Sequence, residues 1–198
     1  MLFRSKTYSQ YWPASTLAGD AQAIVCDDPD TVFKVVMCSA TTVIASASTA
    51  MLGQNFGLIQ NAGNANTGDS AVAALYSAST TGVDLALRVV GLVPETAIVT
   101  SAVGSSSGTA ITCSALPSAL VVGTEVGYIA ANGQYVQSGS YVSVAAAAGA
   151  TSVTINSTIA AAGLTAIPSN STIVFTQYPE MLVKLNFGTH SYYTGTAV

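Results

Sequence analysis

The chain has 198 residues, of which 50% are hydrophobic and only 7% are charged. This composition excludes a disordered chain, which would be poor in apolar residues and rich in charge. It also excludes a membrane-spanning helix, because polar residues interrupt every apolar stretch before it reaches about 20 residues. The net charge of −4, with five basic residues, argues against nucleic-acid binding, which depends on Lys and Arg.

Residues 1–20 predict an N-terminal arm that is rich in aromatic side chains. Tyr8, Tyr11 and Trp12 follow one another without a clear period, and such residues need a surface to pack on. That surface is either the domain itself or a neighbouring subunit. The arm lacks the apolar block of a signal peptide, so we expect the chain to be made in the cytoplasm.

Residues 21–97 predict the first group of strands. The segments 21–26 and 31–37 are rich in apolar and β-branched residues and flank a turn signal at residues 27–30. Further strands are expected at 70–76 and 85–93, whereas the Asn- and Gly-rich segment 61–68 predicts a loop.

Residues 98–176 differ in character, because they consist of Ser, Thr, Ala, Gly and Val with almost no charge. Apolar and polar residues alternate over 108–113, as in a half-buried strand, and 121–130 is another candidate strand. Asn132-Gly133 is a favoured hairpin dipeptide. Several short strands at this spacing indicate a small sandwich or barrel.

The C-terminal segment 181–187 restores the charged strand pattern, and it could pair with residues 85–93. We therefore predict an all-β protein, with a β-sandwich or jelly-roll/barrel-like core and a second small β-domain inserted into it. The expected organisation is an arm at 1–20, a discontinuous core at 21–97 plus 177–198, and an inserted domain at 98–176. Insertion at a loop is tolerated because only the loop ends must meet.

The sequence lacks the residue patterns of catalysis. His190 is the single histidine, and neither a Gly-x-Ser-x-Gly elbow nor a Gly-Lys-Ser/Thr phosphate loop is present. Cys26, Cys38 and Cys113 have no metal-ligand spacing and are interpreted as buried free thiols. The acidic cluster at 27–30 is interpreted as a solvated turn, with a weak cation site as the alternative. We expect no enzyme activity, no cofactor and no metal.

Five short patterns in chain order resemble one family of proteins. They are Phe-x-Val at 33–35, Gln-Asn at 54–55, the Asn-rich segment ending in Thr-Gly at 63–68, Arg-Val-Val-Gly-Leu at 88–92 and Val-Lys-Leu-Asn at 183–186. Together they resemble the capsid decoration, or cement, proteins of tailed bacteriophages. The resemblance covers the first half of the chain and the last twenty or so residues, and the inserted region departs from the family's compact form.

The resemblance implies a virion structural protein that binds the outer surface of the capsid and stabilises contacts between major capsid subunits. Its partners would be the major capsid protein and further copies of itself, with a trimer favoured over a dimer, and neither nucleic acid nor membrane. Aromatic residues are enriched in interface cores, and those of the two termini, together with the histidine, are the candidate contacts. These candidates are Tyr8, Tyr11, Trp12, His190, Tyr192 and Tyr193.

The alternative function is a host-receptor or glycan-binding module displayed on the virion, of the head-fibre or adhesin type. Sugar binding favours exposed aromatic side chains, and the inserted region carries Tyr128, Tyr135 and Tyr141. The same region has few acidic residues, so the pattern leaves both functions open.

Overall fold

A computed structural model provides the fold. It describes residues 15, 17, 21–22, 24, 26, 28, 30–39, 44–64, 66–67, 69–80, 85–159 and 166–186.

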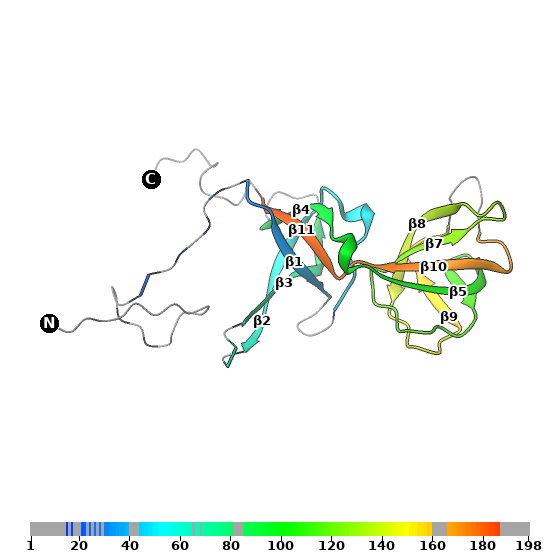
Figure 1. The fold of residues 1–198 in the computed structure, drawn as a ribbon, viewed down its shortest axis with the longest axis horizontal. Helices are drawn as coiled ribbons and strands as arrows, with labels where there is room; N and C mark the ends of the chain where they lie inside the picture. Colours follow the sequence, from blue (N-terminus) through cyan, green and yellow to red (C-terminus); the bar gives the residue numbers. More distant parts are fainter. Residues whose placement is uncertain are drawn as a thin grey trace.

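The described residues form two closed β-barrels (Figure 1). The first barrel has the strand order β1-β11-β4-β2-β3 and the second has the order β10-β5-β6-β9-β8-β7. Two short 3₁₀ helices, η1 (Thr49–Met51) and η2 (Pro94–Thr96), are the helical elements of the described residues. The all-β prediction is therefore confirmed.

Strand bounds of the first barrel are β1 (Phe33–Cys38), β2 (Asn55–Asn64), β3 (Asp69–Thr80), β4 (Leu87–Leu92) and β11 (Glu180–Leu185). Strand bounds of the second barrel are β5 (Ile98–Ser107), β6 (Ala110–Cys113), β7 (Glu125–Ile129), β8 (Tyr135–Val144), β9 (Ser152–Ile155) and β10 (Ser171–Gln177).

Each barrel has its own apolar core. In the first barrel Met37, Phe56 and Met181 are fully buried, and in the second Ile173 and Phe175 are fully buried. Alternation produces these cores: along β6 the side chains of Ile111 and Cys113 point inward while their neighbours face out. The alternation predicted over 108–113 is confirmed for 110–113, whereas residues 108 and 109 form a turn.

The second barrel is formed by the stretch of chain between β4 and β11. β11 returns to the first barrel and pairs antiparallel with β4, from Met181 opposite Leu92 to Leu185 opposite Leu87. The pairing expected between 181–187 and 85–93 is thus confirmed. The chain crosses between the barrels twice, at η2 before β5 and at Tyr178–Pro179 after β10.

The strand register gives the first barrel two different ends. Val36 of β1 lies opposite Glu180 at the end next to the second barrel, and Phe33 lies opposite Val183 toward the other end. At that other end, which we call the arm end, the chain enters β1 and leaves β11, so residues 1–32 and 186–198 both join the barrel there. The second barrel lies at the opposite end of the first (Figure 1).

The β2–β3 hairpin projects out of the first barrel (Figure 1). β4 pairs with β2 at Asn55 and Phe56, and Phe56 lies opposite Leu87, where β4 begins. Leu87 in turn lies opposite Leu185, the last residue of β11. The β2 residues after Phe56 therefore run beyond the end of β4, paired with β3 (Figure 1).

Three local predictions from the sequence are wrong. The described positions 21, 22, 24 and 26 are not in a strand. Residues 61–64 belong to β2, because pairing of Asn61 with Ala71 and of Asn64 with Asp69 provides backbone partners that override the loop propensity of Asn and Gly. Residues 121–124 form a turn before β7, in which Gly123 adopts the positive φ of +87° that glycine tolerates.

Candidate functional site

The two barrels are joined by a seam of backbone hydrogen bonds. Ser46 donates its N–H to the carbonyl of Val122 at 2.8 Å, and Ala47 donates to the carbonyl of Tyr178 at 2.8 Å. The Ser46 hydroxyl accepts the N–H of Tyr178 at 2.7 Å and donates to the carbonyl of Ala47 at 3.0 Å. Ser46 is fully buried, so water does not compete for these bonds.

Gly123 lets the second barrel approach this seam closely. A Cβ atom at this position would lie 1.9 Å from the Ser46 carbonyl oxygen and 2.9 Å from Cε2 of Tyr76. No other residue type fits without moving the backbone of Ser46. The glycine is therefore required by the contact between the barrels as well as by its positive φ.

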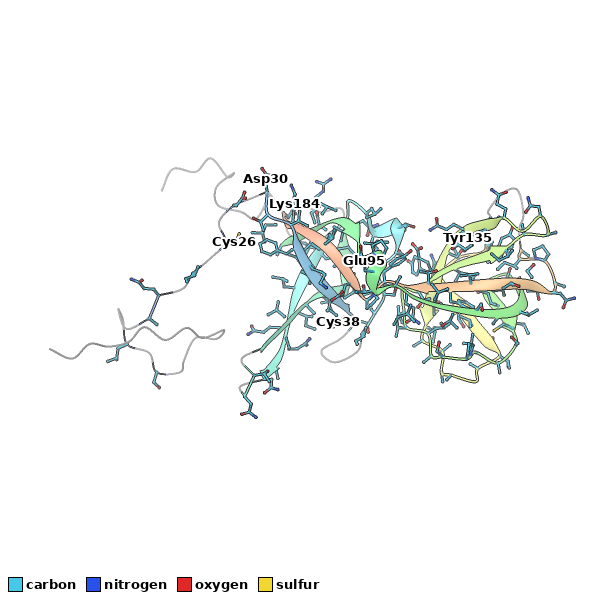
Figure 2. The ribbon with its side chains drawn as sticks, in the orientation of Figure 1. Cys26, Asp30, Cys38, Glu95, Tyr135 and Lys184 are labelled. Atoms are coloured by element: carbon cyan, nitrogen blue, oxygen red, sulfur yellow. The ribbon has the colours of Figure 1, made fainter. Side chains whose placement is uncertain are left out.

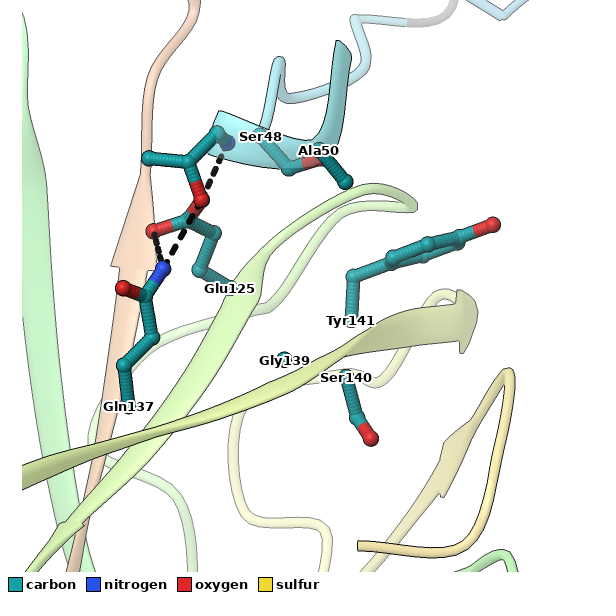
Figure 3. Close-up of a pocket in the computed structure, with 8 residues that line it drawn as sticks. Ser48, Ala50, Glu125, Gln137, Gly139, Ser140 and Tyr141 are labelled. Atoms are coloured by element: carbon teal, nitrogen blue, oxygen red, sulfur yellow. Dashed lines mark hydrogen bonds between the residues drawn. The ribbon is translucent and has the colours of Figure 1, made fainter. Parts of the chain in front are cut away.

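Glu125 adds a carboxylate to the seam from the start of β7. One oxygen accepts the backbone N–H of Thr49, and the other accepts the side-chain amide of Gln137 at 3.3 Å. Gln137 also donates to the hydroxyl of Thr49 at 2.8 Å (Figure 3). Three residues from two barrels thus form a closed polar triangle, and Glu125 is only 6% exposed.

A groove of about 300 Å³ opens beside this triangle. One wall comes from Ser48 and the start of η1, and the other comes from β7 and β8. In Figure 3 Glu125 and Gln137 lie on one side and Tyr141 on the other, with Gly139 between them. The groove is lined by Ser48, Thr49, Ala50, Glu125, Gln137, Gly139, Ser140 and Tyr141.

Ser48 contributes a buried hydroxyl to this region. The residue is 2% exposed, and its Oγ atom has no hydrogen-bond partner in the part of the chain that the structure describes. It does not cap η1 through its side chain either. Ser46 and Ser48 are therefore both buried, but among the described residues only the Ser46 hydroxyl has hydrogen-bond partners.

The tyrosines around the seam have altered acidity. Burial, followed by the interaction and hydrogen bond with Tyr141, raises the pKa of Tyr76 to about 12. Burial and then the charge of Glu125 raise the pKa of Tyr178 and of Tyr135. These phenols stay protonated at neutral pH, so they act at the seam as hydrogen-bonding groups and not as bases.

The second barrel presents a surface without formal charge. Residues 98–177 contain one charged residue, Glu125, and that residue is buried. Val99 and Val103 of β5 are 63% and 50% exposed, and Ser101 between them is exposed. The outer surface is therefore made of methyl groups, hydroxyls and amides.

Tyr135 is the exposed aromatic side chain of this surface (Figure 2). Its ring covers Gly127, where an added Cβ would lie 2.5 Å or less from three ring and hydroxyl atoms of Tyr135. Its hydroxyl is hydrogen-bonded to Thr176. These contacts hold the ring over Gly127.

The charges of the described residues concentrate on the first barrel. Lys184 pairs with Asp30 at 3.2 Å at the arm end, and Lys34 pairs with Glu180 at 3.0 Å. Figure 2 shows Asp30 and Lys184 at the end of the first barrel away from the second. Arg88 of the same barrel is exposed on β4.

The predicted contact residues of the two termini lie outside the described residues. These are Tyr8, Tyr11, Trp12, His190, Tyr192 and Tyr193. Of the tyrosines considered for sugar binding, Tyr128 is 1% exposed and belongs to the core, so its predicted surface role is wrong. Tyr135 and Tyr141 remain accessible but lie on different features, the outer face and the groove.

Sequence reasoning missed Glu125. The available signal was its isolation, because no other charged residue occurs between Glu95 and Glu180. A lone charge in a neutral segment indicates a specific polar contact, but the sequence does not show that its partners are Thr49 and Gln137.

No group of three metal-ligating side chains occurs among the described residues. Their three cysteines are free thiols, of which Cys38 and Cys113 are buried, whereas Cys26 is exposed, contrary to the prediction that all three are buried. Burial raises the pKa of the Cys38 and Cys113 thiols. Within the described ranges no helix has the length and apolar character needed to cross a membrane.

Comparison of the chain with protein-family models, with curated proteins and with solved structures finds no match.

Proposed function

We propose that the protein is a virion structural protein of a tailed bacteriophage, which binds the outside of the capsid and stabilises contacts between major capsid subunits. It acts through surface contacts and carries out no chemical reaction. The observation that most supports this proposal is that the two ends of the molecule differ in character. The arm end holds the bases of both terminal segments and an ion pair, and the other end is a barrel without surface charge.

The arm end is suited to face the capsid. The aromatic contact candidates Tyr8, Tyr11 and Trp12 belong to a segment that enters the barrel here, and Tyr192 and Tyr193 belong to the segment that leaves it. Segments of 12 or more residues can reach about 40 Å when extended, which is enough to cross a neighbouring subunit. Copies standing side by side on the shell would exchange such contacts, and a trimer is the favoured arrangement.

The second barrel then projects away from the capsid. Because a surface of hydroxyls and methyl groups has no charge, neighbouring copies do not repel one another electrostatically there. Such a surface also does not attract charged macromolecules of the cell. The seam at Ser46 and the Glu125 triangle hold this barrel in one orientation. A rigid two-barrel unit fits a lattice role because a fixed shape repeats without loss of register.

Binding to capsids that lack the protein tests the proposal. Purified full-length protein should bind such capsids with saturation at a fixed ratio to the major capsid protein. Trp12→Ala, in the arm, should weaken this binding at least tenfold, because a buried aromatic anchor contributes about 2 kcal/mol or more to an interface. Tyr135→Ala, on the second barrel, is the matched control and should bind like the unchanged protein.

The same two variants separate the glycan-binding alternative. If sugar binding is the function, a glycan array should detect specific ligands of the full-length protein, and Tyr135→Ala should abolish the signal. Absence of any ligand on the array, together with saturable capsid binding that needs Trp12, supports the decoration role. Specific glycan binding without capsid binding would contradict it.

A further inference from the structure

Glu125 is a buried carboxylate that forms no ion pair with a basic side chain among the described residues. Residues 98–177 contain no Lys, Arg or His, and the ion pairs of the described residues join Lys34 to Glu180 and Lys184 to Asp30. The groups that donate to Glu125 are the N–H of Thr49 and the amide of Gln137, both neutral. Neutral donors hold the carboxylate in place without cancelling its formal charge.

The space next to this carboxylate is open. Glu125 lines the groove, and Gly139 between it and Tyr141 has no side chain (Figure 3). A Cβ atom added at Gly139 would meet nothing within 4 Å. Each oxygen of Glu125 accepts one hydrogen bond, and a carboxylate has about four acceptor positions, so further donors can be accommodated.

We propose that this groove binds the cationic end of an arginine or lysine side chain presented by a partner protein. A volume of about 300 Å³ lies at the lower limit for ligand sites, and it suits one side chain better than a large cofactor. A guanidinium or ammonium group supplies the missing counter-charge and several N–H donors. Tyr141 on the opposite wall provides an aromatic group to which cations are attracted.

A neutral ligand fits this groove less well than a cation. A sugar hydroxyl can donate to Glu125, but it leaves the charge of this buried carboxylate uncompensated, which is unfavourable. The second barrel also has no other charged side chain that could bind the cation instead of Glu125. The inference does not depend on the capsid proposal, because the groove and its charge exist in the isolated protein.

Titration of the full-length protein with N-acetyl-arginine amide, followed by two-dimensional ¹⁵N NMR, tests the inference. The backbone N–H signals of Thr49 and Gly139 should shift with saturation. N-acetyl-citrulline amide is the matched control ligand, because it has nearly the same shape without the charge. It should bind at least tenfold more weakly. Equal shifts with both ligands, or none with either, would overturn the inference.

Two substitutions that each remove one negative charge test whether binding needs the carboxylate in the groove. Glu125→Gln should weaken arginine binding at least tenfold, while Glu95→Gln, on the exposed η2 helix, should leave it unchanged. If Glu125→Gln loosens the seam, Tyr141 provides an independent readout. Tyr141→Leu should weaken arginine binding several-fold, whereas Tyr141→Phe, which keeps the ring, should bind arginine like the unchanged protein.

A third ligand tests whether the cation is a side chain of a partner protein or a free polyamine. Spermidine is a free polyamine with the same ammonium chemistry, and it should bind no more tightly than the arginine amide after correction for its number of charges. Saturation by spermidine at concentrations ten times lower would assign the groove to a small polycation and overturn the assignment to a partner's side chain.

Discussion

At the scale of single residues, two buried serines at the seam differ in whether their hydroxyl groups form hydrogen bonds. Ser46 and Ser48 lie two positions apart and are both buried. Only the first uses its hydroxyl in the described hydrogen bonds, to Tyr178 and Ala47. A buried polar group stabilises the folded state when it is bonded and destabilises it when it is not.

Ser46→Ala should therefore lower the free energy of unfolding by about 1–3 kcal/mol, because it leaves the buried N–H of Tyr178 without an acceptor. Ser48→Ala should leave the free energy of unfolding unchanged or raise it slightly, since it removes a hydroxyl that has no partner. Urea denaturation of both variants measures the difference. Equal losses at the two positions would contradict this account of the seam.

The raised pKa of Tyr76 predicts how stability responds to alkaline pH. The folded-state pKa is about 12, above the ordinary value of about 10 that the unfolded chain keeps. The folded state thus holds the phenol proton more tightly, and its stabilising contribution is complete below pH 10. It is lost progressively as the pH rises from about 10 to 12.

Tyr76→Phe should reduce this alkaline loss of stability, because the substituted ring has no proton to release. The measurement is the free energy of unfolding at pH 8, 10 and 11 for both proteins. Other tyrosines with raised pKa, Tyr135 and Tyr178, keep part of the slope. An unchanged slope in Tyr76→Phe would contradict the assignment.

At the scale of elements, Gly123 controls how β7 approaches the first barrel. Gly123 and Gly133 both have positive φ, +87° and +81°, so alanine at either position incurs about 1 kcal/mol of backbone strain. At Gly133 an added Cβ meets nothing within 4 Å, whereas at Gly123 it meets the Ser46 carbonyl.

Gly123→Ala should therefore destabilise the protein by roughly 2 kcal/mol more than Gly133→Ala, since overpacking against backbone adds to the strain. Thermal unfolding of both variants tests this difference. Small-angle scattering should also show a changed distance distribution for Gly123→Ala alone, because the barrels must separate to admit the methyl group. Equal effects on both measurements would show that the contact at Ser46 is unimportant.

Strand propensity and alternation predicted much of the element structure. The alternation at 110–113, the Asn132-Gly133 turn before β8 and the pairing of the last strand with 85–93 could all be derived, because each depends on local patterns. The projection of β2 through 61–64 could not, since its Asn and Gly residues favour loops in isolation. The groove could not be predicted either, because it brings Thr49, Glu125 and Gln137 together from distant parts of the chain.

At the scale of the whole molecule, the distribution of charge determines how the protein responds to salt. The described ion pairs are the two on the first barrel, Lys34–Glu180 and Lys184–Asp30, and each includes an exposed partner. Pairs of this kind contribute at most about 1 kcal/mol and are screened by salt. The second barrel has no surface charge to screen.

The free energy of unfolding should thus change by less than about 1 kcal/mol between low salt and 0.5 M NaCl, because the ion pairs of the described residues are exposed ones of this kind. Chemical denaturation with urea at the two salt concentrations makes the comparison. A change of several kcal/mol would indicate ionic contacts that this account does not contain.

The two-ended arrangement makes the strongest claim about function, and the position of each barrel on a capsid tests it directly. The measurement is a cryo-electron microscopy map of capsids that lack the protein, after incubation with a saturating amount of it. We predict ordered density for the first barrel against the shell, with its arm end facing the major capsid subunits and the second barrel projecting outward. Absence of added density, or a second barrel seated on the shell with the arm end facing solvent, would contradict the account.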